Sequence, residues 1–508
     1  MQMKQIHYAL KSMVVAAFAA ASTSAVAQPG PSNLLDATAI GVGDGARQSS
    51  TQIDAVVNNP AGTGFMTDGF HLSLSGLGSW QRIDCALANE NNRVHVNHHK
   101  TSRITPSLQA AWKHGSWTLS GSWACEGGYG RYNNDNVPHV NGLSIPTQVA
   151  FFEFNQYTTV TNFLASVMIP GINVNAEDMF AGLTTSQHAS LYKWVGRLGA
   201  AYRINDHLSV YVGAKLSYLR GRTNSDVGIL MLRPSTGQTW SLADYWNAAA
   251  DHMLNSDLTN REDMAASLRE LAHIDVPSLH YTLKQNQIRV APVIGLHYRA
   301  GAVNIGARYE FKSHFGEAYG TSDVTEAAVT KVGGYDLPDL LTVGADWQVA
   351  PRWNVAVGAS MSFTSSHPYG RYTWLVGSSD FGWPKDKIDC TAAASVTFDA
   401  SSKWRLTVGG AFVQQKGYFN ASDSDIALPG IRYLRPSLGC SYKINDKCQL
   451  MAGVNEAFAL SNGFMLNNNL NVIGETESGD SYTQTLSTRE YGSLKHAVTY
   501  AIGINYSF

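Results

Sequence analysis

Three closely spaced histidines, His95, His98 and His99, could bind a metal ion or haem. The alternative, which we prefer, is an exposed polar loop that carries no ligand. The sequence contains no nucleophile elbow, no His-Glu-x-x-His motif and no Walker loop. Its five cysteines are an odd number without metal-like spacing. We therefore predict that the protein is not an enzyme and that it holds no metal and no cofactor.

Four basic residues, Arg197, Lys215, Arg289 and Arg308, lie at the polar positions of segments in which polar and apolar residues alternate. Residues of one parity share one face of a strand, so these cations lie opposite the apolar side chains. A buried cation requires a partner. Either a carboxylate of the protein, such as Glu310 beside Arg308, or the carboxylate of a ligand could serve.

The segments that must position these cations are predicted strands. Residues 208–216, 303–312 and 353–363 alternate with a period of two, which indicates strands with one apolar face. Six short turns each follow an aromatic residue by a few positions, at His114–Gly115, Asn205–Asp206, Ala300–Gly301, Ala350–Arg352, Ser401–Lys403 and Asn445–Asp446. Aromatic residues beside turns are typical of a girdle at a membrane interface.

Long connections join the other ends of the strands, as in the stretches from about Tyr132 to Ser190 and from about Asn224 to Lys284. Short turns on one side and long loops on the other are the layout of an outer-membrane barrel. Counting the turn-linked pairs predicts an all-β fold, a transmembrane antiparallel β-barrel of about 14 strands over residues 70–508. Its last strand ends on Phe508, which resembles the signal read by the barrel-assembly machinery of the outer membrane.

The composition suits a barrel with a lipid-facing surface. Charged residues make up only 15% of the chain, aromatic residues reach 10%, and there are 46 glycines. A net charge of -2 gives no indication of nucleic-acid binding. Lys4 and Lys11 precede an apolar run, and the small residues from Ala25 to Ala27 offer a cleavage site, so residues 1–27 are predicted to be a signal peptide.

Residues 28–69 lack the strand pattern, and we predict that they form an N-terminal plug, or hatch, inside the barrel. Its most distinctive part is the compact turn at Asn59, Pro60 and Ala61. Pro60 fixes its own φ and disfavours the helical conformation at Asn59. An ordinary surface turn before the first strand is the alternative, and the barrel that follows favours the hatch.

Clustered glycines interrupt the third predicted strand at Gly127, Gly128 and Gly130, after clean alternation from Trp117 to Cys125. Clustered glycine in a strand indicates a bulge, a bend or a close backbone approach, although the strand could also end there. These glycines are our candidates for a kink in the wall.

One long loop contains two predicted helices. Leu242, Tyr245, Trp246 and Met253 fall at helical spacing, and a second helix is predicted from Arg261 to Ala272. The apolar stripes could pack against each other. Alternatively, they could form an external groove for an apolar ligand.

With the plug-like turn, the strand count and the terminal aromatic residue in place, the chain resembles the FadL/TodX family of outer-membrane transporters for long-chain fatty acids and other hydrophobic compounds. The resemblance rests on Asn59-Pro60-Ala61, which matches the Asn-Pro-Ala motif of the family's hatch, and on the closing strand from Ile502 to Phe508. It covers essentially the whole chain after the signal peptide, through short motifs.

The resemblance implies a monomeric channel that admits hydrophobic molecules by gated passive diffusion. In the family, ligand passes from an external groove to a pocket in the lumen, shifts the hatch and leaves sideways through a gap at a kink in the third strand. The basic lumen residues would then be partners for a ligand carboxylate. The partners expected on this reading are the hydrophobic ligand and the lipids of the outer membrane. A general porin, or an outer-membrane receptor for haem or another hydrophobic ligand, is the alternative.

Overall fold

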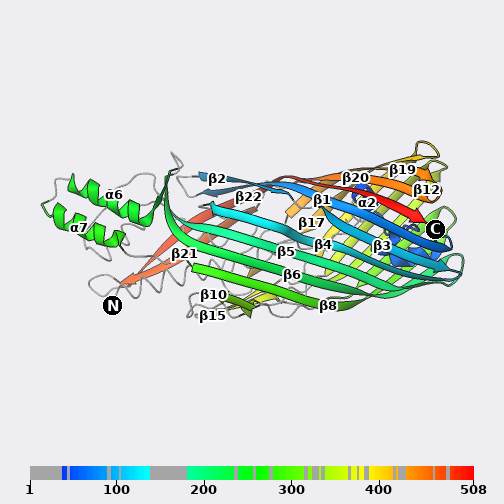
Figure 1. Cartoon of the computed structure of the whole chain (residues 1–508), viewed down its shortest axis with the longest axis horizontal. Coiled ribbons are helices and arrows are strands. Elements are labelled where there is room, and N and C mark those ends of the chain that lie inside the picture. The colour runs from blue at the N-terminus through cyan, green and yellow to red at the C-terminus, as the bar shows by residue number, and fades with distance from the viewer. Residues whose placement is uncertain are drawn as a thin grey trace.

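The protein is a closed antiparallel β-barrel in which each wall strand is hydrogen-bonded to its two neighbours (Figure 1). The structure is a computed structural model, and it describes residues 37–42, 46–88, 93–101, 104–137, 180–233, 238–255, 259–273, 279–313, 319–322, 331–332, 338–363, 368–374, 377–382, 388–415, 419–420, 431–460, 464–475 and 481–508. Within these ranges, 14 strands form the wall, and β1 pairs with β22 to close it. The predicted fold class is therefore confirmed.

The wall strands follow one another in chain order. They are β1 (Gly69–Ala88), β3 (Thr105–His114), β4 (Trp117–Val137), β5 (Phe180–Arg203), β6 (Leu208–Arg233), β8 (Leu279–Ala300), β9 (Val303–Glu310), β12 (Asp339–Ala350), β13 (Trp353–Phe363), β16 (Ile388–Asp399), β17 (Trp404–Gln415), β19 (Ile431–Asn445), β20 (Cys448–Ala459) and β22 (Ser481–Ser507). The wall is uneven in height, because β5 and β6 have 24 and 26 residues whereas β9 has 8.

Further strands lie toward the long-loop end, which is the left end in Figure 1. Four of them pair with wall strands, namely β2 (Arg93–Thr101), β7 (Gln238–Ser241), β10 (Tyr319–Ser322) and β21 (Phe464–Glu475). A separate four-stranded sheet contains β11 (Lys331–Val332), β14 (Pro368–Trp374), β15 (Gly377–Gly382) and β18 (Phe419–Asn420). Parts of the predicted long loops therefore form strands. His95, His98 and His99 belong to β2, which pairs with β1, so the expectation of an irregular loop at these histidines was wrong.

The six predicted short turns are present at the other end, where they join β3 to β4, β5 to β6, β8 to β9, β12 to β13, β16 to β17 and β19 to β20. Gly115 and Gly301 each have a φ of 57° in these turns, a conformation that glycine adopts without strain. Alternation along the strands separates the two faces of the wall. On β6, for example, Val212 is 68% exposed on the lipid side, whereas Lys215 is only 4% exposed on the lumen side.

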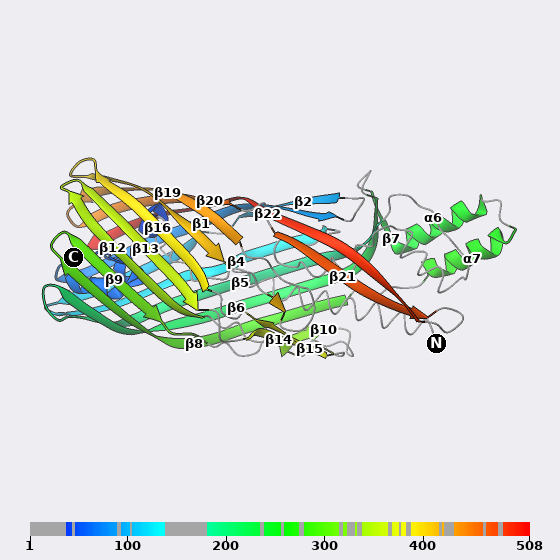
Figure 2. The ribbon, with the colours of Figure 1, turned by 180° about the vertical axis from the view of Figure 1, so that it is seen from behind.

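A helical hairpin lies beyond the long-loop end of the barrel (Figures 1 and 2). It consists of α6 (Leu242–Leu254) and α7 (Arg261–Ala272), which pack against each other. The hydroxyl of Ser241 accepts a hydrogen bond from the main-chain N–H of Asp244 at 3.0 Å, which caps α6. Among the described helices, none is long and apolar enough to cross a membrane.

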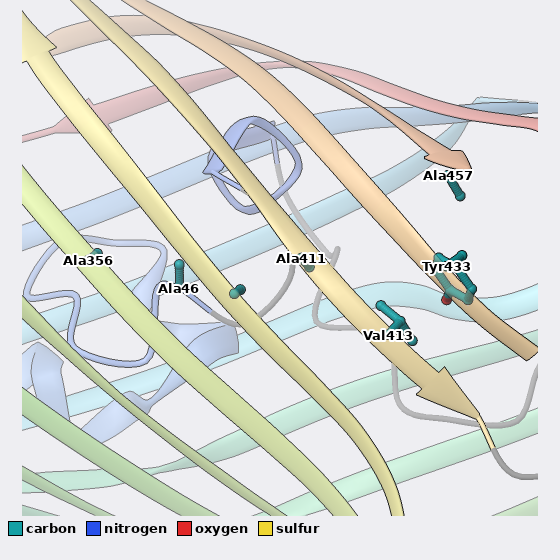
Figure 3. Close-up of a cluster of buried hydrophobic side chains, with 7 residues drawn as sticks. Ala46, Ala356, Ala411, Val413, Tyr433 and Ala457 are labelled. Carbon is teal, nitrogen blue, oxygen red and sulfur yellow. The ribbon is translucent and has the colours of Figure 1, made fainter. Parts of the chain in front are cut away.

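The hatch lies inside the barrel near the short-turn end, and its described part comprises residues 37–42 and 46–66. It contains α2 (Ala37–Val42), α3 (Ala55–Asn58) and the 3₁₀ helix η1 (Pro60–Phe65). Helix α2 packs on β19 and β20, whereas η1 packs on β4, β5, β6 and β8. Ala46 belongs to a cluster of buried apolar side chains that includes Ala356, Ala411 and Tyr433 of the wall (Figure 3). The hatch therefore contacts both halves of the wall.

Candidate functional site

The Asn59 side chain joins the hatch to the barrel wall. Its Nδ2 donates hydrogen bonds to the carbonyl oxygen of Gln48, 3.1 Å away within the hatch, and to that of Leu296 on β8, 3.0 Å away. The hydroxyl of Thr342 on β12 donates to Oε1 of Gln48 at 3.0 Å. Asn59 and Gln48 are both fully buried, so loss of these bonds would leave buried polar groups unsatisfied. We call this group of contacts the latch.

Three wall glycines, Gly295, Gly306 and Gly344, make room for the latch. A Cβ added to Gly306 would lie 1.9 Å from the carbonyl oxygen of Gln48. One added to Gly295 would lie 2.8 Å from Oδ1 of Asn59, and one added to Gly344 would lie 2.9 Å from Cβ of Gln48. The hatch therefore lies directly against the wall backbone, through the main chain of Gln48 at β9 and through the side chains of Asn59 and Gln48 at β8 and β12. We call these three residues the glycine seat.

An ion pair within the hatch holds the turn that leads into the latch. The guanidinium of Arg47 donates to both carboxylate oxygens of Asp54, at 2.7 and 2.9 Å. The same carboxylate accepts a hydrogen bond from the hydroxyl of Ser50 at 2.8 Å. A bidentate pair of this kind fixes geometry as well as charge. It helps to give the segment from Arg47 to Asp54 a defined shape.

A second cluster lies in the lumen, where Glu310 on β9 contacts three cations. Its Oε2 lies 2.7 Å from Nζ of Lys215 on β6, and its Oε1 lies 2.9 Å from Nη2 of Arg197 on β5 and 3.3 Å from Nε of Arg308. All four side chains are buried. Three of the four predicted lumen cations therefore meet at the carboxylate that was proposed as a partner. We call this group the lumen ionic cluster.

Arg289, the fourth predicted cation, has a different environment. It lies on β8 opposite Ser217, and its Nη1 donates to the carbonyl oxygen of the adjacent Ile288 at 2.7 Å. Lys215 lies two residues from Ser217 along β6, opposite Ala291. Arg289 is thus two residues along β8 closer to the long-loop end than the level of Lys215 in the lumen ionic cluster.

Val57 connects the hatch to both the lumen ionic cluster and the third wall strand. Its carbonyl oxygen accepts a hydrogen bond from Nη1 of Arg308. Its side chain packs against Ala124 on β4 in a small buried cluster. The pairing of β4 with β5 shifts register immediately after this contact, between Cys125 and Gly127, and again between Gly127 and Gly130. The predicted kink candidates therefore lie in an irregular part of the wall beside the hatch.

A polar cavity of about 290 Å³ lies between the hatch and the short-turn end. It is lined by Arg47 and Gln52 of the hatch and by Asp346, Asp399 and Arg405 of the wall, among others. The last two form a bidentate pair at 2.6 and 3.1 Å. The described residues thus place ionic and amide groups on the axial route from the hatch toward the short turns.

The helical hairpin corrects the prediction that the apolar residues of α6 form an external groove. Trp246 and Met253 are buried on one stripe of α6, and Met264 and Leu268 are buried on one stripe of α7. Because the two helices pack on each other, these side chains fill the interface between them rather than an open groove. Leu242 and Tyr245 begin the same helix, but their side chains lie outside the described residues.

Other predictions concern parts that the structure leaves undescribed. Residues 1–27, the predicted signal peptide, and residues 28–36 of the predicted hatch lie outside the described ranges. The side chains of His95, His98 and His99 are not described either. Within the described ranges, no group of three or more His, Cys, Asp or Glu side chains is placed to hold a metal ion.

Sequence reasoning missed Gln48, Val57, Thr342 and the glycine seat. Gly306 does fall at a lumen-facing position of its alternating strand, where a glycine can signal a close backbone approach. No comparable sequence signal marks Val57, because its role depends on a main-chain carbonyl group. These residues are recognised only once the hatch and the wall are placed together.

The architecture defines a class: a closed outer-membrane barrel with an internal hatch. No family model matches the sequence. Outer membrane protein P1 of Haemophilus influenzae is 24% identical over 332 residues, which cover 61% of this chain and 64% of that protein, less than two thirds of its length.

Solved structures identify the fold more specifically. The toluene transporter TodX of P. putida matches with a TM-score of 0.52 and 14% identity, covering 92% of this chain and 99% of that one. A Pseudomonas aeruginosa FadL homologue matches with a TM-score of 0.55 and 13% identity, covering 94% and 99% of the two chains. The chain has the barrel fold of the FadL/TodX channels, and it is located in the outer membrane.

Proposed function

We propose that the protein is a channel through which hydrophobic small molecules, such as long-chain fatty acids, cross the outer membrane by gated passive diffusion. The hatch is the gate, and the irregular part of β4 is the lateral exit. The proposal includes no catalysis and treats the channel as a monomer. It is supported by the shared fold of channels for hydrophobic compounds and by the contacts of the hatch.

The contact between Val57 and Ala124 is the observation that carries the proposal. Ala124 lies next to the first register shift of the β4–β5 pair, so the hatch touches the wall where its pairing is least regular. A displacement of α3 would remove a buried apolar contact at this point. Movement of the hatch and opening of the wall would therefore be coupled through one pair of side chains.

The polar cavity favours lateral over axial exit. An apolar molecule that passed the hatch along the barrel axis would meet Arg47, Asp346, Asp399 and Arg405. Contact with these groups would separate them from water or from each other without new hydrogen bonds. An apolar molecule that enters the bilayer through the wall avoids this cost, because its surface stays out of water.

The lumen ionic cluster supports a ligand with an acidic head group. Glu310 is the carboxylate that contacts Arg197, Lys215 and Arg308, so three positive charges share one negative charge in this cluster. A ligand carboxylate at the edge of the cluster would be a further acceptor for the guanidinium and ammonium groups of these residues. Its arrival would also weaken the hold of Arg308 on Val57, which would link ligand binding to hatch release.

A disulfide between hatch and wall tests the gate. In a variant without native cysteines, Val57→Cys with Ala124→Cys should block fatty-acid uptake into proteoliposomes when oxidised and permit it when reduced. Thr397→Cys with Thr407→Cys is the matched control, because these side chains face each other across β16 and β17 with their hydroxyl oxygens 3.1 Å apart. Equal uptake by the oxidised Val57–Ala124 variant and the control would refute the gate.

A second cross-link tests the exit. Gly127 pairs with Lys193 in the irregular region, and Gly121 pairs with Leu198 in the regular region of the same two strands. Cross-linking cysteines at the first pair should reduce uptake, whereas cross-linking the second should not. Rapid sugar entry that neither cross-link nor the hatch lock changes would instead indicate a general porin.

A further inference from the structure

The outer face of β6 and β8 carries an exposed basic patch close to the long-loop edge of the apolar belt. Even-numbered residues of both strands face lipid within the belt, where Leu216 is 37%, Ile288 57% and Val290 65% exposed. The same parity continues toward the long loops to Arg220, Arg222 and Lys284, and all three side chains are exposed. We call these three residues the basic patch.

The strand register places the three cations side by side. Arg222 lies directly opposite Lys284, and Arg220 lies opposite Asn286, one step closer to the belt. An anion bound between the strands could contact all three cations, and arginine side chains match the geometry of phosphate oxygens.

Aromatic residues show the depth of the patch in the membrane. Trp194 lies opposite Tyr218, and the ring of Trp194 stacks on that of Trp123 with centroids 6.0 Å apart. Tyr218 is ten residues along β6 from Leu208, which pairs with Tyr298 at the short-turn girdle. Ten residues in a tilted strand span about 24 Å, close to the height of the apolar band between two aromatic girdles.

The basic patch therefore lies at the level of the lipid headgroups, just outside the second aromatic girdle. On the lipid-facing side of β6, Arg220 is the next residue after Tyr218, and Arg222 is the next after Arg220. The long-loop end of an outer-membrane barrel is the extracellular end. The headgroups at this level are consequently those of the outer leaflet.

We propose that Arg220, Arg222 and Lys284 bind the phosphate groups of a phosphorylated glycolipid in the outer leaflet. The acyl chains of the same molecule would lie along Leu216, Ile288 and Val290, directly below the cations on the same face. This continuity between an apolar strip and a basic patch fits a membrane lipid better than a soluble phosphate. The site lies outside the barrel and is independent of the proposed transport function.

Native mass spectrometry of the detergent-purified protein with lipid A as the probe tests this site. The triple variant Arg220→Gln, Arg222→Gln, Lys284→Gln should bind lipid A about 100-fold more weakly, since each cation near an anionic surface contributes about fivefold. The control variant removes three exposed cations at the short-turn end, Arg352→Gln, Lys403→Gln and Lys447→Gln, and should bind like the parent.

Two further comparisons separate the lipid from other sources of binding. Chemically dephosphorylated lipid A should bind the parent protein as weakly as intact lipid A binds the triple variant. Inorganic phosphate should fail to displace intact lipid A, because it lacks the acyl chains. The variant Arg220→Lys, Arg222→Lys keeps the charges and should retain most of the affinity. Equal weakening by the control variant, or full binding of the dephosphorylated lipid, would overturn the proposal.

Discussion

Arg308 of the barrel wall donates a hydrogen bond to the main-chain carbonyl oxygen of Val57 in the hatch. The same side chain lies 3.3 Å from the carboxylate of Glu310, so one guanidinium belongs to both the lumen ionic cluster and the hatch contact. A change in the charge of the cluster would therefore alter the hydrogen bond between Arg308 and Val57. Because Val57 also packs on Ala124 beside the irregular part of β4, the effect would extend to the wall.

Replacing Glu310 should destabilise the protein strongly. Glu310→Gln leaves three buried cations without the carboxylate they share, and removal of one partner of a buried ion pair costs about 3–5 kcal/mol. Urea unfolding in lipid vesicles measures the change. Asp399→Asn provides the control, because its pair with Arg405 is partly exposed, and we expect a loss below about 1 kcal/mol. Similar losses for the two variants would contradict a special role of the cluster.

Changes at Asn59 should loosen the hatch. Asn59→Ala removes two hydrogen bonds, each contributing about 1 kcal/mol. Asn59→Asp should have a larger effect, because a carboxylate would then face the carbonyl oxygens of Gln48 and Leu296. Ion conductance in planar bilayers should rise in the order parent, Ala, Asp. If the Asp variant conducts no more than the parent, the latch does not hold the hatch.

Gly306→Ala should displace the hatch by steric conflict alone. The new Cβ would lie 1.9 Å from the carbonyl oxygen of Gln48, and the main chain of the hatch must move away. Labelling of a cysteine introduced at Gln52, on the polar cavity, reports this movement. Gly121→Ala is the control, since its Cβ would have an ordinary contact of 3.4 Å with Leu198. Unchanged labelling in the Gly306 variant would show that the seat is not tight.

Asp68 should make a contribution to stability that disappears in acid. Its carboxylate accepts hydrogen bonds from the main-chain N–H of Gly115 at 3.3 Å and from Nζ of Lys113 at 3.4 Å. These interactions, the first above all, lower its pKa from the usual 3.8. A lowered pKa in the folded state stabilises the fold above the unfolded value and ceases to do so as the pH falls through the folded value.

The stability difference between the parent and Asp68→Asn should therefore be present at neutral pH, decline as the pH falls below 3.8, and vanish at an acid pH below the lowered folded-state pKa of Asp68. Midpoints of urea unfolding at the two pH values provide the measurement. A difference that is the same at both pH values would mean that the charge of Asp68 has no role.

Much of the wall could be predicted from sequence because a strand has only two faces. Alternation placed Arg197, Lys215 and Arg308 on the lumen side correctly, and the short turns followed from local residue types. The convergence of these three cations on Glu310 could be anticipated only in part. It depends on the stagger between β5, β6 and β9, which no single strand encodes.

The hatch was harder to predict, since its contacts depend on main-chain groups and on the absence of side chains. The seat at Gly295, Gly306 and Gly344 becomes visible only when Asn59 and Gln48 lie against it. The apolar stripe of α6 posed the opposite problem, because Trp246 and Met253 show the same spacing whether they face a ligand or another helix. The pairing with α7 decides between these uses.

The two anchor points of the hatch have a consequence for the order of folding. Gly41 rests between Gly439 and Gly453, where an added Cβ would lie 2.6 Å from the Cα of Gly439, whereas Gln48 rests on β9 and β12. The first anchor needs β19 and β20, which are among the last strands to be synthesised. The hatch, although it is encoded first, can therefore complete its contacts only after strands from both halves of the wall have joined the barrel.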